Sequence, residues 1–239
     1  TSETLTSETQ TSVQISDNTS DKTSQMSPFG TDLSECSKEN NMLTSVPISL
    51  NSNYDILPLG KISGWSHVTP TDHWYFDVDI VDGEPVDILA PASGYIVKLD
   101  RASDEEGLGD YRIILEHSCT LFSYYIHLRE IDPAILKETG EIRPGRSIFP
   151  RIPVSSGQPV GKVGPLLSYQ RISNQTNLDF ALIDTKVTLP GFIIPSHYEE
   201  AWKIHTVDPF DYYEESLRSQ LLERNLRDVE LSRMLNLPV

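Results

Sequence analysis

The chain has few basic residues and no long apolar run, and these two shortages exclude several classes of protein. Among 239 residues there are 19 lysines and arginines against 35 aspartates and glutamates, a formal net charge of −16. Binding nucleic acid or anionic lipid through a broad surface needs clustered cations, which this composition does not offer. No segment approaches the ~20 apolar residues of a membrane-spanning helix. We therefore expect no nucleic-acid partner and no membrane span.

Cysteine is equally scarce, which limits the covalent and metal chemistry available. Cys36 and Cys119 are the only two, and they lack the CxxC spacing of zinc-thiolate sites. Two alternatives remain: one disulfide that ties the N-terminal segment to the rest of the chain, or two free thiols. The sequence also begins without Met and without a basic-then-apolar leader, from which we expect a mature or trimmed form.

Residues 1–45 are rich in Ser and Thr and poor in large apolar side chains. Such a segment buries too little surface to offset the entropy lost on ordering, so we predict a disordered tail or linker. This composition is typical of extracellular stalks. We therefore expect a secreted or cell-surface protein.

From about residue 54 the sequence changes to short β-rich runs separated by Gly, Pro and Asp. Residues 76–80 alternate apolar and polar side chains, which is typical of a strand with one buried face. Further runs cover 86–89, 94–99, 111–116, 121–126, 158–164 and 178–183. Many short strands without helical periodicity between them predict a mainly β domain over residues 46–212, an antiparallel β-sandwich or barrel.

Three segments interrupt or follow this pattern. Residues 132–155 contain four prolines, and 185–200 are rich in Pro, Gly and aromatic residues; we expect irregular loops in both. In the last part, 213–239, apolar residues recur at near-helical spacing and predict a C-terminal helix from about 213 to 235. That helix either packs on its own domain or mediates oligomer or partner contact.

His73 and Asp77 are candidate metal ligands, since an imidazole and a carboxylate both suit a divalent cation. Residues four apart on a straight strand are separated by ~13 Å, so the chain must bend for both to reach one ion. Pro70 just upstream favours a loop at His73, with the strand starting near Phe76. Taken alone, this pair does not distinguish a metal site from ordinary packing.

The residues from His73 to Val97 resemble the opening of the lysostaphin-type (LytM-like) zinc endopeptidases, which read H-x-G-x-D, then G-x-x-V, then A-x-x-x-G-x-V. Four more motifs follow in the family's order: 111–117 as the strand ending in His, 125–128 as Y-x-H-L, 157–164 as G-Q-x-V-G-x-V-G and 207–209 as V-D-P. The resemblance covers about residues 60 to 213. It implies an antiparallel fold of the duplicated-hybrid-motif type and an active-site groove lined by the motif residues.

The same resemblance implies roles for five residues. His73 and Asp77 correspond to zinc ligands, and His127 to the histidine that assists the catalytic water. The family's late H-x-H pair reads Asn177-Leu-Asp179 here, so Asp179 falls on the third ligand position and Asn177 on the catalytic one. The chain therefore departs from the family at the residues that carry its chemistry.

These departures weaken both metal binding and hydrolysis. One imidazole with two carboxylates is a harder, more anionic ligand set, which shifts preference away from zinc and makes the ion a poorer acid for its water. Asn177 cannot accept or release a proton near neutral pH, and losing a general base or acid costs a factor of ~10² to 10⁴. A divalent ion, zinc in the family, is thus expected to be weakly bound or absent. Trp65, Trp74 and Tyr75 either line the groove or pack in the core.

Three hypotheses follow, and whether the protein is an enzyme stays open among them. The first is a degenerate, non-catalytic peptidase-like protein that binds a peptide, cell-wall component or protein in the inherited groove. The second is an active endopeptidase in which His73, Asp77 and Asp179 hold the ion and His127 activates water. The third is a secreted interaction module whose C-terminal helix and tail carry the function.

Overall fold

The computed structural model describes residues 25–38, 42–61, 71–102, 109–164, 175–189 and 199–225. Within these ranges no helix is both long and apolar enough to cross a bilayer.

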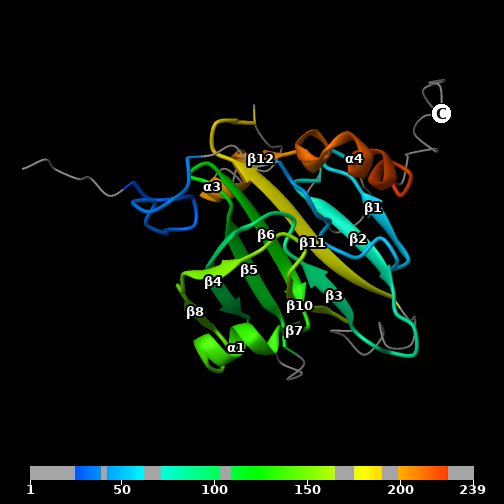
Figure 1. The fold of residues 1–239 in the computed structure, drawn as a ribbon, viewed down its shortest axis with the longest axis horizontal. Coiled ribbons are helices and arrows are strands. Elements are labelled where there is room, and N and C mark those ends of the chain that lie inside the picture. The colour runs from blue at the N-terminus through cyan, green and yellow to red at the C-terminus, as the bar shows by residue number, and fades with distance from the viewer. Residues whose placement is uncertain are drawn as a thin grey trace, which may run out of the picture.

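Within these described ranges, a nine-stranded antiparallel sheet forms the main layer (Figure 1). Its strands are β1 (Tyr54–Leu57), β2 (Trp74–Asp79), β4 (Gly94–Arg101), β5 (Tyr111–Glu116), β6 (Leu121–Leu128), β8 (Arg146–Ile148), β9 (Ile152–Val154), β11 (Gln175–Asp184) and β12 (Thr206–Val207). The order is β1-β2-β11-β6-β5-β4-β8, with β12 beside β11 and β9 beside β4. The long strand β11 thus joins the pair β1–β2 to the strands β6, β5 and β4.

A second sheet of three strands packs on one face of the first. It contains β3 (Val86–Leu89), β10 (Pro159–Val163) and β7 (Glu130–Ile131), in the order β3-β10-β7. The main core lies between the sheets, where Phe76, Tyr125 and Leu178 of the large sheet share one buried cluster with Ile88 and Val160 of the small one. The predicted antiparallel β-sandwich is confirmed, and the sheets do not close into a barrel. We call the other face of the large sheet the outer face.

The helices are short and sit at the ends of the sandwich (Figure 1). Those in the described part of the chain are α1 (Pro133–Thr139), α3 (Ala201–Ile204), the 3-10 helix η2 (Pro209–Tyr212) and α4 (Glu215–Leu222). The prediction of an irregular 132–155 is wrong, because α1, β8 and β9 all lie there. Asp132 caps α1 by accepting from the Ala134 amide, and Pro133 occupies the first turn, where its missing N–H costs nothing. Of the loop expected at 185–200, residues 190–198 lie outside the described ranges.

The C-terminal helix is present but shorter than the predicted 213–235. It ends at Leu222, because the next residues are held by β1 instead: the Arg224 carbonyl accepts from the Ile56 amide, and Asn225 bridges to Ile56. Residues 226–239 lie outside the described part. Leu221 is fully buried in the main core, so this helix packs on its own domain.

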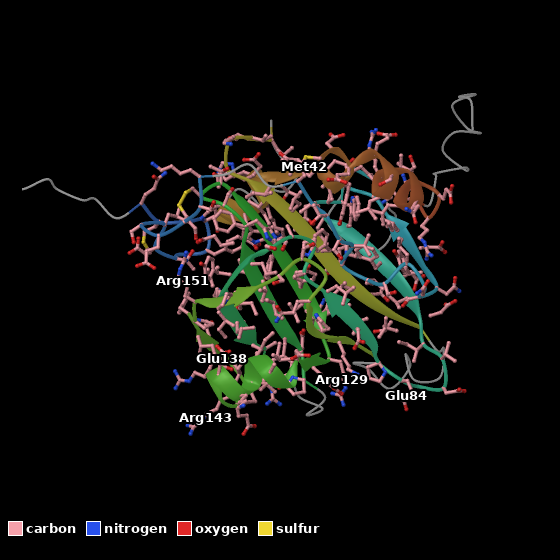
Figure 2. All side chains as sticks on the ribbon, viewed as in Figure 1. Met42, Glu84, Arg129, Glu138, Arg143 and Arg151 are labelled. Atoms are coloured by element: carbon pink, nitrogen blue, oxygen red, sulfur yellow. A yellow bond between two sulfur atoms is a disulfide. The ribbon has the colours of Figure 1, made fainter. Side chains whose placement is uncertain are left out.

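Residues 25–38, which we call the N-terminal segment, lie on the outer face, and residues 1–24 and 39–41 of the predicted tail lie outside the described ranges. Cys36 is disulfide-bonded to Cys119, the first of the two alternatives for the cysteines. Leu33 and Phe29 pack on a second apolar cluster there, formed by Val97, Ile114, Phe122, Tyr124, Ala181 and Ile183. Arg151, labelled in Figure 2, donates to the Glu35 carbonyl at 2.8 Å and so fixes the end of the segment. The domain boundary at residue 45 stays a prediction.

Candidate functional site

Neighbouring strands β2 and β11 bring most of the predicted site residues onto the outer face. In their register, Asp77 lies opposite Asn177 and Tyr75 opposite Asp179. Because side chains alternate along a strand, these four share one face, while Trp74 and its alternate neighbours point into the core. The two-residue spacing of Asn177 and Asp179, read from the sequence, therefore places both on the same face.

His73 lies in a bend just before β2, as expected, although β2 starts at Trp74 rather than near Phe76. Its Nδ1 is 2.6 Å from the Asp72 carboxylate and its Nε2 is 3.1 Å from the Asp179 carboxylate. All three side chains are buried. The contacts are ion pairs by distance, while the N–H bonds do not point well at the oxygens. His73 is thus clamped between two acids.

His127 reaches the same group of residues through an irregularity in β6. Tyr111 pairs with Leu128 and Ile113 with Tyr125, so two residues of β6, Ile126 and His127, stand opposite one residue of β5. This is a β-bulge, and His127 adopts it with φ of 69°, a left-handed conformation that costs a non-glycine residue about 1 kcal/mol or more. The bulge turns the His127 ring to the outer face, where regular alternation would have pointed it into the core.

The result is a chain of alternating acids and histidines, which we call the Asp–His chain: Asp72, His73, Asp179, His127 and Asp110. Its remaining links join His127 Nε2 to Asp179 at 3.6 Å and His127 Nδ1 to Asp110 at 3.3 Å. Lys203 of α3 extends it at one end, 3.5 Å from Asp72 and 2.9 Å from Glu200.

The pKa values of the residues in the Asp–His chain are set mainly by the charges of their neighbours within it. Burial alone would lower the pKa of His73, but the carboxylates of Asp179 and Asp72 outweigh it and raise that pKa to about 9. The same effects act on His127: burial lowers its pKa, but Asp110 and Asp179 outweigh burial, so the pKa is raised. Burial would raise the pKa of Asp72, yet His73 and Lys203 bring it below its usual value. His73 is therefore favoured as a cation near neutral pH, and the pKa of His127 is shifted in the same direction.

The predicted metal set does not come together as a three-ligand centre. Asp77 is half-buried, and the charges that raise its pKa, after burial, are those of Asp55 and Asp79. Both ring nitrogens of His73 face carboxylates, which suits an imidazolium rather than a ligand with a free lone pair. Throughout the described ranges, no three His, Cys, Asp or Glu side chains converge with the geometry of a metal site. The residues present do not fit the zinc centre that the resemblance implies.

The remaining candidates divide between surface and core. Asn177 is exposed at the margin of the outer face. Trp74 is fully buried and packs 4.4 Å from the Phe210 ring, so it belongs to the core and not to a binding surface. Tyr75 is buried with its ring 4.2 Å from that of His73, and burial with the charges of Asp179 and Asp72 raises its pKa. Trp65 lies outside the described residues.

Sequence reasoning missed three members of the site. Asp72 adjoins His73 and could have been noticed by position, but nothing in its motif marks it as a partner. Asp110 and Lys203 join the site only through the β6 bulge and the placement of α3, which no local pattern encodes.

Comparison with known proteins finds likenesses in structure alone. No family model and no curated protein matches the chain. A SpoIIQ–SpoIIIAH pore-forming complex aligns with a TM-score of 0.42 at 17% identity, over 73% of this chain and 92% of that one. Lysostaphin from Staphylococcus simulans aligns with a TM-score of 0.40 at 17% identity, over 78% and 60% of the two chains. A zinc-containing peptidase from Vibrio cholerae gives 0.37 at 14% identity, over 72% and 40%. At such identities and scores these likenesses assign no activity.

Proposed function

We propose that this chain is a non-catalytic protein with a degenerate lysostaphin-like site, and that it binds a peptide, cell-wall or protein ligand on the outer face beside His127. One observation carries the proposal. Asp179 lies between His73 and His127, 3.1 Å and 3.6 Å from their Nε2 atoms. The charged side chains of the site are therefore already paired with one another.

Hydrolysis would need a group that takes a proton from water, and neither candidate is suited to it. Asn177 has no titratable group near neutral pH. His127 directs Nε2, the nitrogen that would accept the proton, toward the Asp179 carboxylate. The one titratable candidate, His127, is thus held against Asp179, and Asn177 offers no replacement for it.

A binding role needs accessible side chains beside the Asp–His chain, and the outer face provides them. The His127 side chain is 40% exposed, and Asn177 is exposed. Trp202 of α3 is half-buried, with its ring 5.4 Å from that of Tyr124, which provides an aromatic wall on the α3 side. Polar tips around an aromatic wall are typical of sites that hold peptides.

The decisive experiment measures binding and cleavage together. The full chain is incubated with soluble cell-wall peptides, with and without a glycine cross-bridge, and with their uncrosslinked stems; titration calorimetry follows binding and mass spectrometry follows cleavage. We expect binding with no new fragments. Cleavage that is abolished both by a chelator and by His73→Ala would refute the proposal and support the alternative, an active metal-dependent endopeptidase.

A further inference from the structure

The Tyr75 side chain is buried among the predicted metal ligands. Tyr75 is only 4% exposed, and its neighbours Trp74 and Phe76 belong to the main core, so its ring is on the outer face. The ring centroid is 4.2 Å from that of the His73 ring. Asp77 is the next residue of β2 on the same face, about 7 Å further along the strand. Tyr75 therefore separates the two predicted ligands that this stretch of chain contributes.

The third predicted ligand is a cross-strand neighbour of the same side chain. Tyr75 stands directly opposite Asp179 in the register of β2 and β11, a position in which Cβ atoms are ~4.5–5.5 Å apart. Burial, followed by the charges of Asp179 and Asp72, raises the pKa of Tyr75, so its hydroxyl stays protonated at neutral pH. A metal ion binds deprotonated ligands, so Tyr75 contributes bulk here and not a ligand atom. Of the two apolar clusters formed by the described residues, neither includes Tyr75, so its ring packs against the site rather than in a core.

Two links of the Asp–His chain resemble the surroundings of a metal-bound histidine. The His73 Nδ1 atom is 2.6 Å from the Asp72 carboxylate, and a carboxylate at the second ring nitrogen orients histidine ligands in metal sites. The other nitrogen, Nε2, is 3.1 Å from Asp179. Two atoms bound ~2.0–2.2 Å from one tetrahedral ion lie roughly 3.3–3.6 Å apart, so a small widening of this ion pair would suffice. The predicted ligand that does not join them is Asp77, on the far side of Tyr75.

We infer that Tyr75 is the residue that excludes a divalent metal ion from this site, because its ring fills the space between His73, Asp77 and Asp179. All three predicted ligands are present in the chain, and the bulk between them keeps them apart. The mismatch between the predicted metal set and the structure then has a single steric cause at position 75. Without a side chain there, one imidazole and two carboxylates can reach a common ion. Metal exclusion by Tyr75 is independent of whether the outer face binds a peptide.

The test removes the ring and measures whether a metal site forms. Full-length wild type, Tyr75→Gly and Tyr75→Phe are titrated with Co²⁺, whose visible absorption reports its ligands, and with Zn²⁺ in a calorimeter. The titrations are run at pH 8, where protons compete less for His73. We expect Tyr75→Gly to bind one ion per chain about 100-fold more tightly than the wild type, since losing even a second-shell partner costs ~10–100-fold and here a ligand is gained. Tyr75→Phe, which keeps the ring and loses only the hydroxyl, should behave like the wild type.

Two double variants identify the ligands. Adding Asp77→Asn to Tyr75→Gly should return the affinity to the wild-type value, because the third ligand is lost again. Adding Asp55→Asn instead, which makes the same change in charge directly opposite Asp77, should leave the gained affinity in place. If Tyr75→Gly does not fold, because glycine weakens a strand and a buried ring is lost, Tyr75→Ala takes its place. A rise in Tm on adding Zn²⁺ is a second readout for either variant, since an ion that binds the folded state stabilises it.

Four results would overturn the inference. They are metal binding by the wild type as tight as that of Tyr75→Gly, no gain in a folded Tyr75→Gly or Tyr75→Ala, an equal gain in Tyr75→Phe, and a gain that survives Asp77→Asn. The first three would show that the ring does not exclude the metal, and the last that the ion binds elsewhere. Peptide binding by the wild type, which tests the proposed function, is measured without added metal and is decided separately.

Discussion

The substitution Asp179→Asn distinguishes two descriptions of the site, the ion-paired Asp–His chain and a metal centre, more sharply than any other single change. In Asp179→Asn the two ion pairs at 3.1 Å and 3.6 Å are lost at a side chain that is only 10% exposed. Removing one partner of a buried pair costs ~3–5 kcal/mol. Because His73 keeps Asp72 and His127 keeps Asp110, we expect the lower end, a loss of about 3 kcal/mol in the free energy of unfolding. For a chain of this size that lowers the Tm by about 6–12 °C.

The matched control is Asp77→Asn, the other predicted carboxylate ligand. Asp77 is half-buried beside Asp55 and Asp79, so removing its charge relieves repulsion and should leave stability unchanged or slightly higher. Urea unfolding of both variants at pH 7, followed by circular dichroism, with metal content measured on each, distinguishes the two arrangements. A shared metal would make both substitutions lose metal and stability together. Equal losses would therefore refute our description of the site.

Three further predictions concern the rest of the fold. Replacing Cys36 and Cys119 by Ser removes a cross-link with a sequence separation of 83, and by loop entropy should cost about 4.5 kcal/mol and open the N-terminal segment to proteolysis. Unchanged protease resistance would contradict the placement of that segment on the outer face. Burial lowers the pKa of His117 to about 4. The free energy of unfolding should therefore keep its full value above about pH 6.5 and fall by about 3 kcal/mol as the pH drops toward 4. His117→Gln should flatten this pH dependence in unfolding titrations. Asp55→Asn removes a like charge directly opposite Asp77 and should raise the unfolding free energy by ~0.2–1 kcal/mol at pH 7, with the gain disappearing in acid; a loss at pH 7 would disprove the repulsion.

The strand positions were largely predictable from sequence, because turn residues bound each apolar run. The runs 86–89 and 111–116 match β3 and β5 to the residue. Strands of two or three residues, such as β7, β8 and β12, carry too few side chains for a periodic signal and are defined only by their partners. The prolines of 132–155 suggested an irregular loop, but Pro133 lies in the first turn of α1, where a proline is compatible with a helix.

The site was only partly predictable. The motif resemblance selected His73, His127 and Asp179, and the structure brings these three together. It also selected Asp77, which lies on β2 four residues after His73, with Asp55 and Asp79 as its charged neighbours. The bulge at His127 could not be read from sequence, since a histidine at a left-handed position has no local signature.

The central position of β11 has a consequence for how this protein is made. Among the residues that the structure describes, the pair β1–β2 and the strands β6, β5 and β4 are hydrogen-bonded to one another only through β11, which begins at Gln175. Until that strand leaves the ribosome, both halves of the sheet expose unpaired edges, and closing them requires contacts of long sequence separation, which form slowly. The strand that carries Asn177 and Asp179 therefore also completes the sheet, so a mutation there affects folding yield as well as the site.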